Sequence, residues 1–375
     1  MNRRQLIVGG ALSSLAAAAP ALRPARAPSG TPHRAIRTKI NRQIAAGVPA
    51  ITAGFIHDGR LWVEGFGVAD LENGTRATAD TAYRFASVQK GMTATAVLQL
   101  AERGRLDLDE DIRRLVPYFP AKPWPITARQ LLGHQGGIPH YVNRAVEQHF
   151  TDHKDTRAAI AIFADFDLIA EPGTRFSYSS YGYNLLGAAI EGASGQSYAD
   201  YMRDHVWRPA GMVATRLDDP LAIIPHRARG YQIVDGALRN SEFIDISSRF
   251  AAGGTRGPVP DLLRFMQALN DGVLLPPSRI AQLYAPMRTR DGGFSGFPGT
   301  EGYAMGWNVM RAHGQRVLHN DGGQQETRTM ILNVPDEKLC VATAQNLERD
   351  DEDVPLVLEI YEAVLGRDFP LPERS

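Results

Sequence analysis

The sequence is short of cysteine and carries no net charge. Its 375 residues include one cysteine, Cys340, so an internal disulfide and a cysteine-rich metal site are both excluded. The 41 basic residues balance the 41 acidic ones, which leaves no general attraction to nucleic acid or to anionic lipid. We therefore expect no nucleic-acid partner.

Motifs for nucleotides and metals are also missing. Neither GxGxxG nor GxxxxGK[ST] occurs, and no pair of histidines or carboxylates has a metal-ligand spacing. No segment after residue 30 is long and apolar enough to cross a bilayer. We expect no metal, no cofactor and no permanent membrane span in the mature chain.

The N-terminus has the layout of a secretory signal peptide over residues 1–27. A basic start is followed by a weakly apolar stretch and then by small residues and prolines. The pair Arg3-Arg4 resembles a twin-arginine export signal, and cleavage after Ala21 or Ala27 fits the small-residue rule. This pattern predicts a soluble periplasmic or secreted protein.

Apolar periodicity predicts strands at both ends of the chain and helices between them. The expected strands are 50–57, 61–69, 303–310, 315–319, 327–334 and 338–345. The expected helices are 33–47, 127–133, 157–169, 181–193, 197–206, 260–271 and 354–366, with a further one after Ser87. Residues 31–105 and 286–370 would thus form one α/β domain, interrupted by a helical domain over 106–285.

A Ser-x-x-Lys motif stands out because lysine is scarce. The chain has only five lysines and 15 serines, so chance would give roughly 0.2 such motifs. Residues three apart on a helix share a face, and an amine with a lowered pKa can take the proton of a serine hydroxyl. Ser87 and Lys90 are therefore a candidate nucleophile and base, the simpler alternative being a capping serine and a solvated lysine.

Two further segments carry polar groups suited to the same chemistry. Tyr178 and Ser180 lie at the entrance of an expected helix, where a phenol could pass a proton to a leaving group, although most such tyrosines only pack. Residues 317–329 contain a glycine turn that would let a strand offer an N–H to an oxyanion, and His319 is its one histidine.

Taken in order, these segments resemble the serine β-lactamase and penicillin-binding-protein superfamily. The resemblance covers about residues 35–365 and is closest to the class C-like branch, with its D,D-carboxypeptidases, esterases and mitochondrial β-lactamase-like serine protease. It rests on RFASVQKGMTATAVLQLAERGRLDLDEDI, ITARQLLGHQGGIPHY, EPGTRFSYSSYGYNLLGAAIE, FAAGGTRGPVPDLLRFMQAL and YAMGWNV, and on the late glycine turn.

The resemblance implies an α+β, β-lactamase-like fold: an antiparallel sheet flanked by helices, plus a mostly helical inserted domain, with the site in the cleft between. By the family's motifs, Ser87 would be acylated, Lys90 would be its base and Tyr178 would relay the proton. A third element would recognise the substrate and supply a second oxyanion N–H.

This sequence departs from the family pattern at two places. Ser180 stands where an asparagine is usual. The third element can be aligned with His319 as its first residue or, keeping the glycine, as Asn320-Asp321-Gly322. We favour the second register and expect the Gly323 N–H at the oxyanion. His319, Asn320, Gly322 and Ser180 stay candidates for substrate binding, and Glu326 would replace another glycine and narrow the cleft.

The sequence therefore predicts an exported serine hydrolase that cleaves an amide or ester through an acyl-enzyme on Ser87. Its substrate would be a peptide or a small molecule, as for a peptidase, a D,D-carboxypeptidase or an esterase. Two alternatives stay open, which are a β-lactamase and a non-catalytic relative that binds a partner or self-assembles.

Overall fold

The computed structural model of the protein describes residues 31–348 and 356–370. The predicted signal peptide, residues 1–27, lies outside the described residues. Within the described part of the chain, no helix is long and apolar enough to traverse a bilayer.

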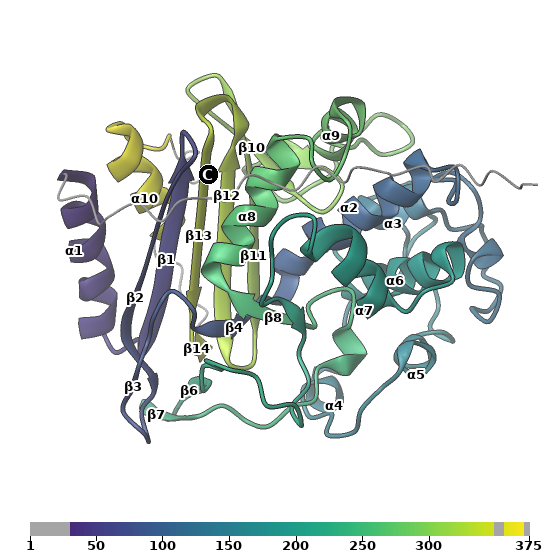
Figure 1. Cartoon of the computed structure of the whole chain (residues 1–375). Helices are drawn as coiled ribbons and strands as arrows, with labels where there is room; N and C mark the ends of the chain where they lie inside the picture. The colour runs from purple at the N-terminus through teal and green to yellow at the C-terminus, as the bar shows by residue number, and fades with distance from the viewer. Residues whose placement is uncertain (1–30, 349–355, 371–375) are drawn as a thin grey trace, which may run out of the picture.

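An eight-stranded antiparallel sheet forms the centre of the molecule (Figure 1). Its order is β3-β2-β1-β13-β12-β11-β10-β9, and β1 pairs with β13 so that Ile51 lies opposite Gln345. The two ends of the chain thus build one sheet. The strands are β1 (Ala50–His57), β2 (Arg60–Asp70), β3 (Thr75–Arg76), β9 (Gly302–Tyr303), β10 (Asn308–Ala312), β11 (Gln315–Gln324), β12 (Thr327–Val334) and β13 (Leu339–Gln345).

Helices cover both faces of this sheet, which is why β1 and β13 are apolar on both sides. On one face lie α1 (Thr31–Ala45) and α10 (Leu356–Leu365), and on the other lies α8 (Val259–Asn270) (Figure 1). Although α8 falls inside the range expected for the helical insertion, it packs on β1 and β13. Its apolar stripe, with Leu262, Phe265 and Met266 buried, explains this position.

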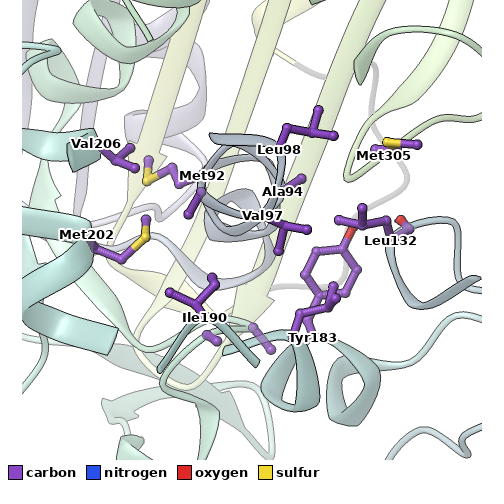
Figure 2. Close-up of a cluster of buried hydrophobic side chains, with 14 of the residues drawn as sticks. Met92, Ala94, Val97, Leu98, Leu132, Tyr183, Ile190, Met202, Val206 and Met305 are labelled. Carbon is purple, nitrogen blue, oxygen red and sulfur yellow. The ribbon is translucent and has the colours of Figure 1, made fainter. Parts of the chain in front are cut away.

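The helical part of the fold surrounds one buried helix, α2 (Gln89–Glu102). Every residue of α2 from Gln89 to Leu100 is buried, as expected of a helix without a polar face. Figure 2 shows Met92 and Val97 of α2 enclosed by side chains from neighbouring helices, among them Ile190 and Met202. The other helices are α3 (Ala128–Leu132), α4 (Arg144–Glu147), α5 (Thr156–Ala161), α6 (Ser180–Ser194), α7 (Tyr198–Met202) and α9 (Pro277–Leu283), with a π-helical turn η3 (Arg203–Trp207).

Short strands occur where only helices and loops were expected. Two small sheets have the orders β4-β8-β5 and β14-β6-β7. Strands of two to four residues are too short to show a period of two, so the sequence pattern misses them. They are β4 (Ala82–Arg84), β5 (Arg216–Leu217), β6 (Tyr231–Val234), β7 (Ala237–Asn240), β8 (Thr255–Pro258) and β14 (Leu347–Glu348).

Two predicted features of the C-terminal region are wrong in detail. The strand expected at 303–310 is divided into β9 and β10, because Gly306 has a φ of +81° and turns the chain between them. The glycine turn expected after His319 is instead the end of β11, which continues to Gln324. The turn to β12 falls at residues 325–326.

Short 3₁₀ turns are η1 (Ala86–Val88), η2 (Ile112–Arg114), η4 (Ser247–Arg249) and η5 (Pro335–Glu337).

Candidate active site

Ser87 lies in the 3₁₀ turn η1, between β4 and the buried helix α2. The simpler alternative, that Ser87 caps α2, does not hold, because the cap position is Val88 and no cap side chain accepts a hydrogen bond there. Ala86 holds a φ of +47°, a left-handed conformation that costs a non-glycine residue free energy and recurs at functional sites. The turn therefore leaves the Ser87 hydroxyl available for other partners.

Those partners are the two predicted proton-transfer residues, Lys90 and Tyr178, which lie 88 residues apart in the sequence. Lys90 Nζ lies 2.9 Å from Ser87 Oγ, and the Tyr178 hydroxyl lies 2.8 Å from the same oxygen. Lys90 also donates to the Ala252 carbonyl at 2.9 Å. One serine oxygen is thus in hydrogen-bond contact with two groups that can move its proton.

Burial sets the protonation of these two groups. It lowers the pKa of Lys90 to about 7, an effect that the charge of Asp321 opposes and that of Arg249 assists. A lysine with this pKa is partly neutral near pH 7 and can accept a proton. Burial raises the pKa of Tyr178 well above its usual value, so the phenol keeps its proton and can act as a donor or relay.

Two histidines hold the segment that carries Tyr178. His134 Nδ1 accepts the Ser179 N–H at 3.1 Å, and His140 Nδ1 accepts the Ser180 N–H at 3.3 Å. The His134 ring also contacts the Tyr178 ring, with centroids 4.3 Å apart. Burial lowers the pKa of His140 to about 3 and that of His134 well below its usual value, so both rings are neutral and able to accept. In the sequence, such histidines in a glycine-rich loop were indistinguishable from ordinary core residues.

Strand β11 reaches the nucleophile through Gly322. A Cβ at this position would lie 2.5 Å from Phe85 O and 2.9 Å from Ser87 N, so only glycine permits this approach. Asn320, two residues earlier on the same face, is buried and donates its Nδ2 to the Gly306 carbonyl at 2.9 Å. Asn320 borders the cleft, but its amide holds the strand rather than pointing free toward a substrate.

Gly323 lies on the part of β11 that has one neighbouring strand. Strand β10 pairs with β11 only as far as His319, while β12 pairs along the remainder. The edge of residues 320–324 is therefore not covered by a strand within the described part of the chain, and Gly323 is exposed in the cleft. Its role as an oxyanion donor stays a prediction.

His319 is placed differently from the expectation. It pairs with Leu332, and that row of residues continues through Val341 to Phe55 on the face covered by α1 and α10. Alternation along a strand puts it on the face opposite Gly322, so His319 does not face Ser87. Its Nε2 is buried and has no hydrogen-bond partner among the described residues. The Asn320-Asp321-Gly322 register is thus the one that meets the nucleophile.

Ser180, the other departure from the family pattern, begins α6 and borders the cleft. It is buried, and its N–H is held by His140. Its hydroxyl is shorter than the usual asparagine amide, and it is close enough to Tyr178 to act on the pKa of that phenol.

Glu326 does not narrow the cleft. It occupies the turn between β11 and β12 with a φ of +77°, the conformation that a glycine would favour. Its carboxylate turns away to bind Arg256 at 2.5 Å and Arg84 at 3.3 Å. Both arginines also bind the buried Asp218, at 2.7 Å each.

The hollow that Ser87 borders has a volume of about 820 Å³, and it extends past β11 to His319, Leu332 and Leu358 on the side of the sheet that α10 covers. Several of its lining residues had not been singled out in the sequence. Phe297 and Tyr141 contribute aromatic surface, and Arg249 contributes a positive charge. Nothing in their sequence neighbourhoods marks them, since they lie in loops or at a short turn without a motif. The other lining residues are Ala86, His140, Arg144, Gln148, Tyr178, Ser180, Ala252, Gly253, Pro298, Gly299, Thr300, Asn308, Met310, Asn320, Asp321, Gly323, Gln324, Gln325, Thr327, Arg328, Met330, Glu348 and Val357.

No cluster of three or more histidine, cysteine or acidic side chains arranged to hold a metal occurs in residues 31–348 and 356–370. Cys340 is buried in the core, and burial raises the pKa of its thiol. A buried thiol with a raised pKa is unreactive.

Comparison with known proteins agrees with this geometry. The family model described as Beta-lactamase matches residues 36–363. The chain belongs to the Beta-lactamase family. The expected α+β, β-lactamase-like fold is confirmed, and membership of this family makes the chain a serine hydrolase.

Two curated relatives are similar to this chain over most of its length. The human mitochondrial serine beta-lactamase-like protein LACTB is 28% identical, over 78% of this chain and 70% of its own. Penicillin-binding protein 4* of Bacillus subtilis is 28% identical, over 84% of this chain and 72% of its own. Among solved structures, the D-amino acid amidase of Ochrobactrum anthropi SV3 with D-phenylalanine has a TM-score of 0.78 at 24% identity, covering 90% of this chain and 100% of that one.

Proposed function

We propose that this Beta-lactamase family member cleaves an ester or amide bond through a covalent acyl-enzyme on Ser87. The observation that carries the proposal is the pair of contacts to one oxygen, from Lys90 Nζ at 2.9 Å and from Tyr178 Oη at 2.8 Å. A structural serine has no need of a buried amine whose pKa is lowered to about 7.

The reaction begins when the Ser87 oxygen forms a bond to the substrate carbonyl carbon. The serine proton passes to the neutral amine of Lys90, and the carbonyl oxygen takes the negative charge. The N–H groups of Ser87 and Gly323 would donate to that oxygen. The bond from carbon to the leaving oxygen or nitrogen then breaks, and the leaving atom receives the proton from Lys90 through Tyr178. Water hydrolyses the acyl-enzyme, releasing a carboxylic acid and restoring Ser87.

Active-site labelling tests the proposal. Purified protein would be treated with a fluorescent fluorophosphonate and, separately, with a fluorescent penicillin. We expect stoichiometric labelling by at least one probe, loss of it in Ser87→Ala, and a strong reduction in Lys90→Met. The Ser87→Ala variant should keep its circular dichroism spectrum. Labelling that survives Ser87→Ala would overturn the assignment of the nucleophile, and no labelling by either probe would favour a non-catalytic binding protein.

The proposal also covers the class of substrate that the protein hydrolyses. Activity on a chromogenic ester, a D-Ala-D-Ala peptide and a chromogenic cephalosporin would rank esterase, D,D-carboxypeptidase and β-lactamase chemistry. We expect the ester to be the best substrate, because Ser180 replaces an amide and Asp321 adds a negative charge to the third element. A cephalosporin hydrolysed faster than the ester would contradict this order.

We further propose that the protein is exported. The support is the sequence of residues 1–27, with Arg3-Arg4, an apolar stretch and small residues near Ala27. Fusion of residues 1–35 to a reporter that is active only outside the cytoplasm tests this. Export that is lost in an Arg3→Lys, Arg4→Lys double variant would indicate the twin-arginine route, and a cytoplasmic reporter would refute export.

A further inference from the structure

Arg249 is a buried cation in the cleft wall, and it has no ion-pair partner among the described residues. Its side chain is 5% exposed, and it lies at the end of the turn η4. A charge removed from water normally gains an opposite charge in return, because an unpaired buried charge is strongly unfavourable. Arg249 therefore differs from Arg84 and Arg256, which both bind carboxylates.

The contacts that Arg249 makes use neutral oxygens and leave part of the guanidinium free. Nη1 donates to Gln324 Oε1 at 3.0 Å and to Gln325 Oε1 at 3.2 Å, and Nη2 donates to the Glu147 carbonyl at 3.2 Å. A guanidinium has five N–H donors, so the Nε–H and one Nη2–H have no partner in the described part of the chain. The side chain also lies against the Tyr141 ring, 5.2 Å from its centroid, which fixes its plane.

The carboxylate of Glu147 does not neutralise Arg249. It is buried and bonds the Tyr181 hydroxyl through Oε1, while its Oε2 has no hydrogen-bond partner among the described residues. No atom of this carboxylate comes within the 4.0 Å of an ion pair with the Arg249 guanidinium. Both residues nevertheless act on the pKa of Tyr181, so they are near neighbours.

The position of Arg249 along β11 indicates which part of a substrate it meets. Its partners Gln324 and Gln325 follow Gly323, while Asp321 precedes Gly323. A substrate lying along the open edge of β11, with its carbonyl oxygen at Gly323, extends one arm toward Arg249 and the other toward Asp321. We assign the acyl group to the Arg249 side and the leaving group to the Asp321 side, and two pairs of esters distinguish this assignment from the reverse one.

We infer that Arg249 binds a carboxylate on the acyl portion of the substrate, so that the protein prefers esters or amides of dicarboxylic or acidic acyl groups. A planar guanidinium with two free N–H groups matches a carboxylate in geometry as well as in charge. This arrangement is the reverse of a carboxypeptidase reaction, in which the carboxylate leaves with the terminal residue. The inference rests on the proposed acyl-enzyme chemistry at Ser87.

A pair of chromogenic esters with one leaving group tests the inference. Mono-4-nitrophenyl adipate carries a free carboxylate at the end of its acyl chain, and its methyl ester masks that charge. We expect kcat/KM to be at least about tenfold higher for the free carboxylate. Arg249→Gln should abolish this preference while still hydrolysing the methyl ester, and Arg249→Lys should keep part of it. Arg144→Gln removes an exposed charge from the same cleft and should change the ratio less than about twofold.

A second pair of esters places the charge on the leaving group. These are the hexanoyl ester of 4-hydroxybenzoate and the hexanoyl ester of methyl 4-hydroxybenzoate. The protein should hydrolyse both with similar kcat/KM. A preference there, or equal turnover of the two adipates by the unsubstituted protein, would overturn the inference. If Arg249→Gln and Arg249→Lys each lower kcat/KM for the two adipate esters by the same factor, Arg249 only holds β11 in place and does not bind the carboxylate. If no ester is hydrolysed in a Ser87-dependent way, the proposed function itself has failed.

Discussion

At the scale of single residues, Lys90 links the chemistry of the cleft to pH. Its amine must be neutral to take the Ser87 proton, and burial lowers its pKa to about 7. We expect kcat/KM for a neutral ester to rise with pH, with a midpoint near 7, because protonated Lys90 cannot act as a base. Asp321 raises this pKa, so Asp321→Asn should move the midpoint to lower pH. A midpoint that moves upward, or activity that falls as pH rises through 7, would contradict Lys90 as the base.

The burial of Lys90 should also lower the stability of the fold. Its pKa in the folded chain lies below that in the unfolded chain, so between about pH 7 and 10 the unfolded chain binds more protons and stability rises with pH. Replacing the buried amine by an apolar side chain removes this penalty. We expect Lys90→Met to be inactive yet more stable at pH 7, by on the order of 1–2 kcal/mol in chemical denaturation. The difference from the unsubstituted protein should narrow by pH 9.5, and a variant that is less stable at pH 7 would contradict the explanation.

At the scale of elements, the approach of β11 to the turn η1 depends on one glycine. Gly322→Ala would put a Cβ 2.5 Å from Phe85 O, which forces the strand away from Ser87. We expect a fall in kcat/KM of about 100-fold, because a displacement of 1 Å is enough for such a loss. Thermal unfolding should also begin at a lower temperature. Gly323→Ala is the matched control for stability, since its Cβ would meet the movable side chain of Arg328 rather than backbone.

The loop from His134 to His140 is a second positioning element. Its two neutral imidazoles accept the N–H groups of Ser179 and Ser180, next to Tyr178. We expect His140→Ala to lower kcat by about tenfold, because the Tyr178 segment loses the hydrogen bond that supports it. His140→Asn, whose side-chain oxygen can accept the same N–H, should recover part of the loss. Equal changes in the two variants would argue against this hydrogen bond as the cause.

The same elements show where the sequence was informative and where it was not. Helices such as α6 and α8 and the hairpin of β1 and β2 were predicted to within a few residues, because their apolar periods are long. Ser87 and Lys90 followed from motif spacing and Tyr178 from the family resemblance, and the structure brings all three together. The path of β11 was not predictable, because Gly322 and Gly323 suggest a turn unless the partner backbone at Ser87 is known. Arg249 and the two histidines act through contacts between distant segments, which leave no local pattern.

At the scale of the whole molecule, a buried charge cluster joins the parts of the fold behind the cleft. Asp218 binds Arg84 of β4 and Arg256 of β8, and Arg256 continues to Glu326 in the turn after β11. Asp218→Asn would leave these two arginines, and Arg227, which binds Asp218 at 3.2 Å, under-neutralised. We expect a loss of about 3–5 kcal/mol in unfolding free energy at pH 7. Asp200→Asn, which breaks an exposed pair with Arg203, should lower the unfolding free energy far less.

The contribution of this charge cluster to the stability of the fold should depend on pH. Burial alone would raise the pKa of Asp218, but Arg256 and Arg84 together hold it well below its usual range. The pKa of this aspartate in the unfolded chain is about 4. The carboxylate therefore stabilises the fold at every pH above that value, and its contribution is lost as the pH falls further. The difference in unfolding free energy between Asp218→Asn and the unsubstituted protein should accordingly shrink below pH 4. A difference that grows in acid would contradict the role of the cluster.

The pairing of β1 with β13 has a consequence for biosynthesis. As the chain leaves the ribosome, the hairpin of β1 and β2 emerges early, and its apolar inner edge has no partner until β13 has been made. Such long-range closure makes folding slow and leaves a strand edge open to aggregation in the meantime. The same topology places Gly322, which lies beside Ser87, in the last segment to be made. A nascent or truncated chain that ends before this segment lacks β11 and the cleft wall that β11 forms, so we expect hydrolysis only when synthesis is nearly complete.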